Sequence, residues 1–210
     1  MKKGLLVVLG ALLLAPVAFG NDWGLGLKLG GARNSPSDLN LIYDNTLAAS
    51  KEKTEGPIYF GVEAMYEFTL NDEVNKLGIK AGADIYANNE VELKGITMTP
   101  GWDETTTEKT YAFPFTVYYK YDQGIEHWSF FGGAGVTILR STIEQTGVAD
   151  VNKTKIFPHI VIGTEYRFSQ AFALGFEGRY NFNAKVEKDD GVLSDRSGFG
   201  AALTGRFYFN

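Results

Sequence analysis

Hydrophobic and polar residues alternate along most of the chain after residue 20. The clearest example is residues 58–70, where seven apolar side chains from Ile58 to Leu70 occupy every second position. The positions between them include Glu63 and Glu67. A repeat of two residues places successive side chains on opposite faces of an extended strand. Residues 58–70 are therefore expected to form a β-strand with one apolar and one polar face.

The same alternation predicts eight strands, at residues 22–33, 58–70, 77–87, 110–121, 128–140, 155–168, 171–182 and 198–209. The connections alternate in length: the long ones are 34–56, 88–109, 141–154 and 183–197, and the short ones are 71–76, 122–127 and Ser169-Gln170. This order is typical of long extracellular loops and short periplasmic turns. The fold class expected is all-β: an eight-stranded, antiparallel, up-and-down transmembrane β-barrel with both termini in the periplasm.

Nearly all charges within the strands fall on the polar face: Lys28, Glu63, Glu67, Lys80, Asp84, Lys120, Glu165, Arg167, Glu177, Arg179 and Arg206. We therefore expect lipid against the apolar face and a lumen lined by the polar one. The alternative is a soluble, lipocalin-like ligand carrier with the apolar face inside. With the charged face inside instead, such a carrier would expose a large aromatic surface to water.

Aromatic residues occupy outward positions at the expected periplasmic strand ends: Trp23, Phe68, Tyr121, Trp128, Phe168, Phe172 and Phe209. They are the candidates for an interfacial girdle. Two prolines, Pro114 and Pro158, fall within predicted strands near the extracellular rim. A bulge, or an early end of strand pairing, is expected at each, because proline cannot donate a ladder hydrogen bond.

The first 20 residues have the pattern of a cleavable signal peptide. Lys2 and Lys3 precede an apolar run that ends at the small-residue site Ala18-Phe19-Gly20. The expected division is therefore a signal peptide at 1–20 and a barrel domain at 21–210. The chain has 210 residues, no cysteine and a formal charge of −5, or −7 without Lys2 and Lys3. This composition excludes a cysteine-based metal site and argues against a nucleic-acid partner.

The stretches WSFFGGAGVTIL, VIGTEYRFS and LGFEGRYNF, together with the ending GRFYFN, resemble the small eight-stranded outer-membrane proteins typified by the membrane domain of outer membrane protein A. The resemblance implies a monomer in the outer membrane of a diderm bacterium, in contact with outer-membrane lipid and lipopolysaccharide and without a cofactor. It also implies assembly by the barrel-assembly machinery. Phe207 and Phe209 correspond to the assembly signal, although Asn210 follows Phe209 here.

The inward charges could line a pore or pair with one another as a plug. Eight strands enclose an interior that side chains nearly fill, and an unpaired buried charge is costly, so we expect a plug. In the resembled family such a network can act as a gate, for which Glu63, Lys80, Glu177 and Arg206 are the candidates. The expected function is structural or surface-interacting and non-enzymatic, with a small-solute or ion channel as the alternative.

A third reading is a lipid A-modifying enzyme, because some relatives hydrolyse acyl chains with a His-x-Ser pair and a downstream glutamate. His127-Trp128-Ser129 has this spacing, but it lies at the expected periplasmic end with both polar side chains inward, and Glu144 lies beyond the other end. No catalytic or metal-binding residue is therefore assigned. His159 is expected to be a hydrogen-bonding group in the lumen. Arg140 could contact a lipopolysaccharide phosphate or simply extend to the interface, and the acidic cluster at 187–195 could bind a cation or only water.

Overall fold

The computed structural model describes residues 22–32, 58–70, 74–87, 89–94, 103–122, 127–145, 151–188 and 191–209. The predicted signal peptide at 1–20, the predicted loop at 34–56 and Asn210 lie outside them. The described residues form eleven strands: β1 (Asp22–Ala32), β2 (Ile58–Thr69), β3 (Asn75–Tyr86), β4 (Asn89–Lys94), β5 (Asp103–Asp122), β6 (Trp128–Gln145), β7 (Val151–Arg167), β8 (Phe172–Asn181), β9 (Lys185–Lys188), β10 (Gly191–Asp195) and β11 (Gly198–Phe209). Among them there is no helix long and apolar enough to cross a membrane.

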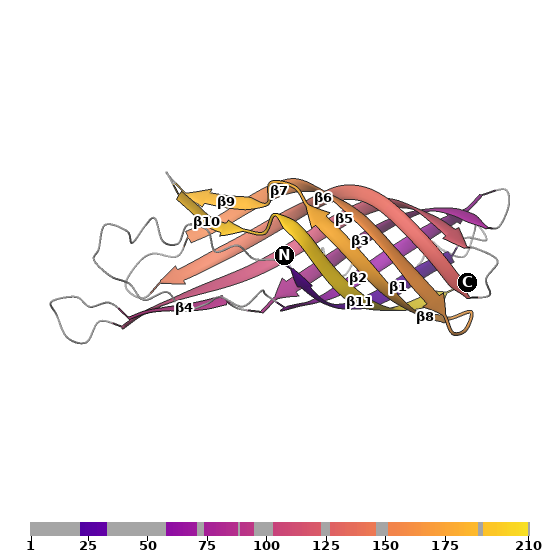
Figure 1. Cartoon of the computed structure of the whole chain (residues 1–210), viewed down its shortest axis with the longest axis horizontal. Coiled ribbons are helices and arrows are strands. Elements are labelled where there is room, and N and C mark those ends of the chain that lie inside the picture. The colour runs from indigo at the N-terminus through magenta and orange to yellow at the C-terminus, as the bar shows by residue number, and fades with distance from the viewer. Residues whose placement is uncertain are drawn as a thin grey trace, which may run out of the picture.

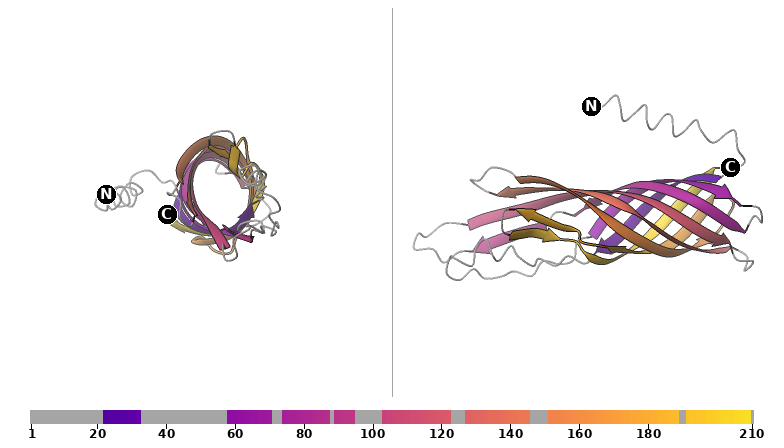
Figure 2. Two further views of the ribbon diagram at one scale, coloured as in Figure 1. Left: turned by 90° about the vertical axis from the view of Figure 1, so that its left-hand side faces the viewer. Right: turned by 90° about the horizontal axis from the view of Figure 1, so that it is seen from above.

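Eight of the strands close into an antiparallel barrel. Each wall strand pairs with its neighbours in the order β3-β2-β1-β11-β8-β7-β6-β5, and β5 pairs back to β3. The first and last strands meet along ten residue pairs, from Trp23 opposite Phe209 to Ala32 opposite Gly200. The end-on view in Figure 2 shows the resulting ring. The predicted eight-stranded up-and-down barrel is therefore confirmed.

The two ends of the barrel differ (Figure 1). At one end, here called the turn end, the chain passes from β7 to β8 by a tight turn in which the Phe168 N–H donates to the Phe172 carbonyl at 2.9 Å. The last strand also finishes there, at Phe209. At the other end, here called the loop end, β5, β6 and β7 extend beyond the wall, and β4, β9 and β10 lie beside them.

The predicted long connections at 88–109 and 141–154 are wrong, because much of each is strand. β4 pairs with the first part of β5 from Asn89 opposite Glu108 onward. β6 and β7 stay paired as far as Ile143 opposite Val151. The sequence of the first part of β5, DETTTEKT, contains no apolar residue, so alternation of hydrophobicity could not reveal this extension. The predicted connection at 183–197 likewise contains the β9–β10 hairpin.

The barrel is polar inside and apolar outside, as the charge pattern predicted. In β1, Leu25, Leu27 and Leu29 are 42–59% exposed on the outer wall, whereas Lys28 is 1% exposed inside. This is the inverse of a water-soluble barrel, in which the apolar side chains fill the interior. The lipocalin-like alternative is therefore wrong.

The two prolines mark places where pairing changes. Between β3 and β5 the paired residues step from Ala81–Phe115 to Asp84–Ala112 without a change of register, so pairing is interrupted opposite Pro114 without a bulge. On the other side of the barrel, β7 pairs with β8 only from His159 onward. The Phe182 N–H donates to the Pro158 carbonyl at 3.0 Å, where β8 leaves the wall. The expected early end of pairing is thus found at Pro158.

Glycine allows β5 and β6 to approach each other closely at one point. A Cβ atom added to Gly135 would lie 1.9 Å from the Phe115 carbonyl oxygen. One added to Gly133 would lie 2.3 Å from the Val117 carbonyl oxygen. Backbone atoms cannot give way as a flexible side chain can, so these positions require glycine.

Candidate functional site

Ten buried charged side chains fill the middle of the barrel. They are contributed by seven of the eight wall strands, and each is at most 7% exposed. We call this set the lumen network: Lys28, Glu63, Glu67, Lys80, Asp84, Lys120, Glu165, Glu177, Arg179 and Arg206. It contains five carboxylates and five cations, so its formal charge is zero. Alternation along each strand brings these residues inside, because every one occupies the polar parity of its strand.

Arg206 of β11 lies at the centre of the lumen network. Its Nε donates to Glu63 at 2.8 Å and its Nη1 donates to Glu165 at 2.9 Å. Its Nη2 is 3.5 Å from Glu177. One guanidinium therefore joins carboxylates from β2, β7 and β8 across the lumen. The planar fork of arginine is well suited to such multiple contacts.

Toward the loop end, the ion pairs continue through Asp84. Lys28 lies 2.8 Å from Asp84 and 3.7 Å from Glu63. Arg179 donates to Asp84 at 2.9 Å and to Glu177 at 3.2 Å. Lys80 also binds Glu177. Every carboxylate in this half therefore has at least two cationic neighbours.

Toward the turn end, Lys120 joins Glu67 and Glu165. Its Nζ lies 3.2 Å from Glu67 and is bonded to Glu165. Two tyrosines also contact these carboxylates: Tyr118 donates to Glu67 at 2.8 Å, and the Tyr208 hydroxyl lies 2.8 Å from Glu165. Buried carboxylates are thus satisfied by both cations and hydroxyls, as low-polarity surroundings require.

An aromatic ring contacts two cations of the lumen network. The Phe131 ring centre is 5.0 Å from Lys80 Nζ and 4.8 Å from the Arg206 guanidinium carbon. Cations are attracted to the face of an aromatic ring, so Phe131 stabilises both. Charged and aromatic side chains thus meet at this level of the lumen.

A smaller charge cluster lies at the turn end, below the lumen network. Lys76 is 2.6 Å from Asp22, 3.6 Å from Asp122 and 3.9 Å from Glu67. The last contact connects this cluster to the lumen network. Because Asp22 begins β1 and Asp122 ends β5, Lys76 of β3 joins strands that lie on either side of its own.

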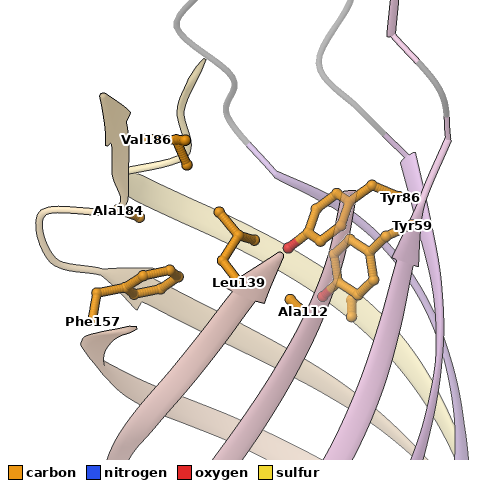
Figure 3. Packing of buried hydrophobic residues seen from close by; sticks show 8 residues of the cluster. Tyr59, Tyr86, Ala112, Leu139, Phe157, Ala184 and Val186 are labelled. Atoms are coloured by element: carbon orange, nitrogen blue, oxygen red, sulfur yellow. The ribbon is translucent and has the colours of Figure 1, made fainter. Parts of the chain in front are cut away.

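Toward the loop end, the polar lumen gives way to apolar packing. His159 accepts or donates one hydrogen bond on each ring nitrogen, to Thr116 at 2.9 Å and to Thr137 at 2.8 Å. Beyond it lies a buried cluster shown in Figure 3: Tyr59, Tyr86, Ala112, Leu139, Phe157, Ala184, Val186 and Ala202. The interior therefore holds a charged layer and, above it, an apolar layer.

The structure brings the four gate candidates together. Glu177 contacts both Lys80 and Arg206, and Arg206 also binds Glu63. Sequence reasoning missed Lys76, Tyr118, Tyr208 and Arg196. The two tyrosines have inward parity, which could have revealed them had uncharged groups been considered. Arg167 is inward as expected and stacks on the Tyr208 ring, with its guanidinium carbon 4.3 Å from the ring centre.

The predicted girdle residues lie on the outer wall at the turn end. Trp23 stacks on Phe209 with ring centres 4.2 Å apart, and Phe172 contacts Phe207 at 5.1 Å. Phe168 contacts Phe172 at 6.0 Å. Phe68, Tyr121 and Trp128 are 39–41% exposed. The two residues of the expected assembly signal, Phe207 and Phe209, thus pack against neighbouring aromatic rings on the outside of the barrel.

His127 and Ser129 do not form a catalytic pair. Ser129 is 4% exposed and faces the lumen. His127 is exposed in a turn with φ of 82°, and its ring packs 5.7 Å from the outward Tyr166 ring. The expectation that His127 points inward is therefore wrong, because its left-handed φ places it in the turn before β6, where the alternation of an extended strand does not apply. Glu144 pairs with Thr107 at the opposite end of β6.

The described residues contain no group of three or more histidine, aspartate or glutamate side chains that could hold a metal ion. The acidic cluster predicted at 187–195 lies partly outside them, since Asp189 and Asp190 are not described. Arg140 is exposed on the outer wall at the loop end of β6, where it pairs with Thr154 of β7.

Comparison with known proteins gives a family and a set of similar folds. The model of a family described as outer membrane protein beta-barrel domain matches residues 4–207. OprG from Pseudomonas aeruginosa superposes with a TM-score of 0.59 at 12% identity, over 90% of this chain and 96% of OprG. Neisserial surface protein A gives 0.51 at 16% identity, over 89% and 95% of the two chains.

The attachment invasion locus protein Ail of Yersinia pestis, in complex with the heparin analogue sucrose octasulfate, gives a TM-score of 0.51 at 14% identity, over 90% of this chain and 99% of Ail. At these identities the likeness concerns the fold alone. No curated protein sequence matches the chain.

Proposed function

Since the chain belongs to the outer membrane protein β-barrel domain family and is an outer-membrane protein, we propose that it is a non-enzymatic barrel with a sealed lumen and a structural role in the envelope. The observation that carries the proposal is the lumen network. Its five carboxylates and five cations are buried and joined by ion pairs into one neutral unit. Moving an ion through it would require separating pairs in a space that side chains already fill.

The orientation follows from the two barrel ends. Outer-membrane barrels place short turns in the periplasm and long connections outside the cell. We therefore assign the turn end to the periplasm and the loop end, with the extended β5–β7 sheet, to the exterior. The aromatic residues at the turn end, from Trp23 to Phe209, then lie at the periplasmic interface of the outer membrane, where aromatic rings are favoured. We also propose that the outer wall contacts outer-membrane lipid and that the exposed Phe207 and Phe209 serve as the assembly signal.

The competing function is a small-solute or ion channel, and single-channel recording separates the two. The purified barrel, folded in a planar bilayer, is expected to show no discrete conductance steps. Glu63→Lys places a third cation beside Arg206 and Lys28, so repulsion should loosen the network and produce openings. Lys153→Glu, an exposed charge change at the loop end, is the matched control and should stay silent.

Regular conductance steps in the unaltered protein, abolished or reversed in selectivity by Glu63→Lys, would show a channel and overturn the proposal. In the native host, loss of a structural barrel is expected to increase sensitivity to detergent. Restoration by the wild-type gene, and equally by Ser129→Ala, would agree with a role that needs no catalysis. Failure of Ser129→Ala to restore resistance would point to the enzymatic reading instead.

A further inference from the structure

The segment between β8 and β11 reaches across the loop end of the lumen. The wall strand β8 ends at Asn181, which pairs with Gly198 at the start of β11. Between these paired positions, residues 182–188 and 191–197 lie outside the wall and contain β9 and β10; we call these two ranges the mouth hairpin. β9 and β10 form a two-stranded sheet of their own. The wall of the barrel is therefore continuous without it.

The mouth hairpin directs two apolar side chains into the barrel. Ala184 is 0% exposed and Val186 is 2% exposed, and both belong to the buried cluster that includes Leu139 and Phe157 of the wall. Figure 3 shows them in one cluster with Leu139 of β6 and Phe157 of β7. Lys185, between them, has a side chain that is 44% exposed. Ala184 and Val186 thus pack against the wall cluster, and Lys185 faces away from it.

Arg196 attaches the mouth hairpin to the far side of the opening. It is 2% exposed, and its guanidinium carbon lies 4.4 Å from the centre of the Tyr86 ring of β3. Its Nη2 donates to Thr110 Oγ of β5 at 3.0 Å. The hairpin is rooted in β8 and β11, three strands away from β3 and β5 in either direction around the barrel. Arg196 therefore spans the mouth.

The chain turns sharply where the mouth hairpin leaves β8 and where it joins β11. Asn183 has φ of 50° and Gly198 has φ of 112°, both in the left-handed region, where short turns are made. Ala184 is held near its root by a hydrogen bond from its N–H to Ser197 Oγ at 2.8 Å. Across the opening, contact with the wall is made by side chains, and a segment held by side-chain contacts opens at lower cost than a strand paired on both sides.

We propose that the mouth hairpin is a lid on the extracellular opening of the lumen and that Arg196 is its latch. The lid lies above the lumen network and is a second, separate closure. Arg196 is a positioning residue, because it acts by holding Ala184 and Val186 in the mouth. The lid controls access from outside to the polar lumen around His159, whether or not ions pass the charged layer below.

The test uses the absence of cysteine from the chain. Ala184→Cys introduces one thiol beneath the lid, and its reaction with a water-soluble maleimide reports how often the lid opens. In the folded full-length barrel this thiol should react slowly. Adding Arg196→Ala should increase the rate by about tenfold or more, the factor expected when one cation–π contact and its hydrogen bond are lost. Val186→Cys should report the same change.

Three controls keep the result specific. Lys185→Cys should react rapidly with and without Arg196. Arg140→Ala, which removes an exposed cation at the same end, should leave the Ala184→Cys rate unchanged. Tyr86→Leu removes the ring under the latch and should act like Arg196→Ala, whereas Tyr86→Phe keeps the ring and should not. Folding of each variant is checked by the shift in gel mobility on boiling.

Two outcomes would overturn the proposal. One is rapid labelling of Ala184→Cys in the otherwise unaltered protein, at the rate of Lys185→Cys, which would mean that nothing closes the mouth. The other is an unchanged slow rate in both Arg196→Ala and Tyr86→Leu, which would mean that the hairpin is fixed without a latch. Neither depends on conductance, so the lid and the sealed lumen network can fail separately.

Discussion

Replacing Arg206 with methionine tests the lumen network most directly. Methionine is also long and unbranched, so it fills much of the same space while it removes the charge. The change leaves three carboxylates without their shared cation: Glu63 at 2.8 Å, Glu165 at 2.9 Å and Glu177 at 3.5 Å. Removing one partner of a buried ion pair typically costs about 3–5 kcal/mol, because the remaining charge is left uncompensated.

The remaining ion pairs show which of the three carboxylates loses most of its charge compensation. Glu165 keeps Lys120 and the Tyr208 hydroxyl, and Glu177 keeps Lys80 and Arg179. Glu63 keeps only Lys28, at 3.7 Å, among the ion pairs of the described residues. We therefore expect Arg206→Met to lower the free energy of unfolding by about 3 kcal/mol or more, mainly through Glu63. Adding Glu63→Gln should recover part of this loss, because it removes the least compensated charge.

Urea unfolding of the refolded barrel, followed by tryptophan fluorescence, gives the four free energies of this double-mutant cycle. The expected coupling between Arg206 and Glu63 is about 1 kcal/mol or more, in the range found for residues in one ion-pair network. Glu63→Gln alone should cost less than Arg206→Met, since Arg206 retains two other carboxylates. A loss below about 1 kcal/mol for Arg206→Met, or simple additivity of the two changes, would refute the reasoning.

Two further predictions concern packing. Gly135→Ala should destabilise the barrel by about 1–3 kcal/mol or prevent its folding, because the new methyl group meets the Phe115 carbonyl at 1.9 Å. The control, Gly31→Ala, points into open space and should change stability by less than about 0.5 kcal/mol. Equal urea midpoints for the two variants would contradict this prediction. Trp23→Leu keeps an apolar side chain but loses the stack on Phe209, so it should lower the free energy of unfolding by about 0.5–1.5 kcal/mol in the same assay. An unchanged free energy of unfolding would show that the two rings do not stabilise each other.

Much of the barrel could be predicted because one physical rule governs each wall strand. Lipid outside and charge inside impose a strict alternation, so the parity of Glu63 or Lys80 fixes the face on which each lies. The same rule says nothing where both faces meet water. The loop-end parts of β5, β6 and β7 were therefore expected to be loops, although they are paired strands.

The partners within the site could be predicted less well than its members. Arg206 meets particular carboxylates because of the stagger of β11 against β2, β7 and β8. The alternation within one strand gives no information about the stagger between strands. Arg196 was missed for another reason. It lies outside any wall strand, and only the folding of the mouth hairpin brings it to Tyr86 and Thr110.

The position of Arg206 in the last strand has a consequence for biogenesis. Its partner Glu63 is 143 residues earlier in the chain, so the central ion pair cannot form until β11 has paired with β1 and the ring has closed. Before that moment, the carboxylates of β2, β7 and β8 lack their common cation, and an open, charge-bearing sheet is poorly tolerated in hydrocarbon. Ring closure and charge compensation therefore occur in one cooperative step, and intermediates that lack the final strand are disfavoured in the bilayer.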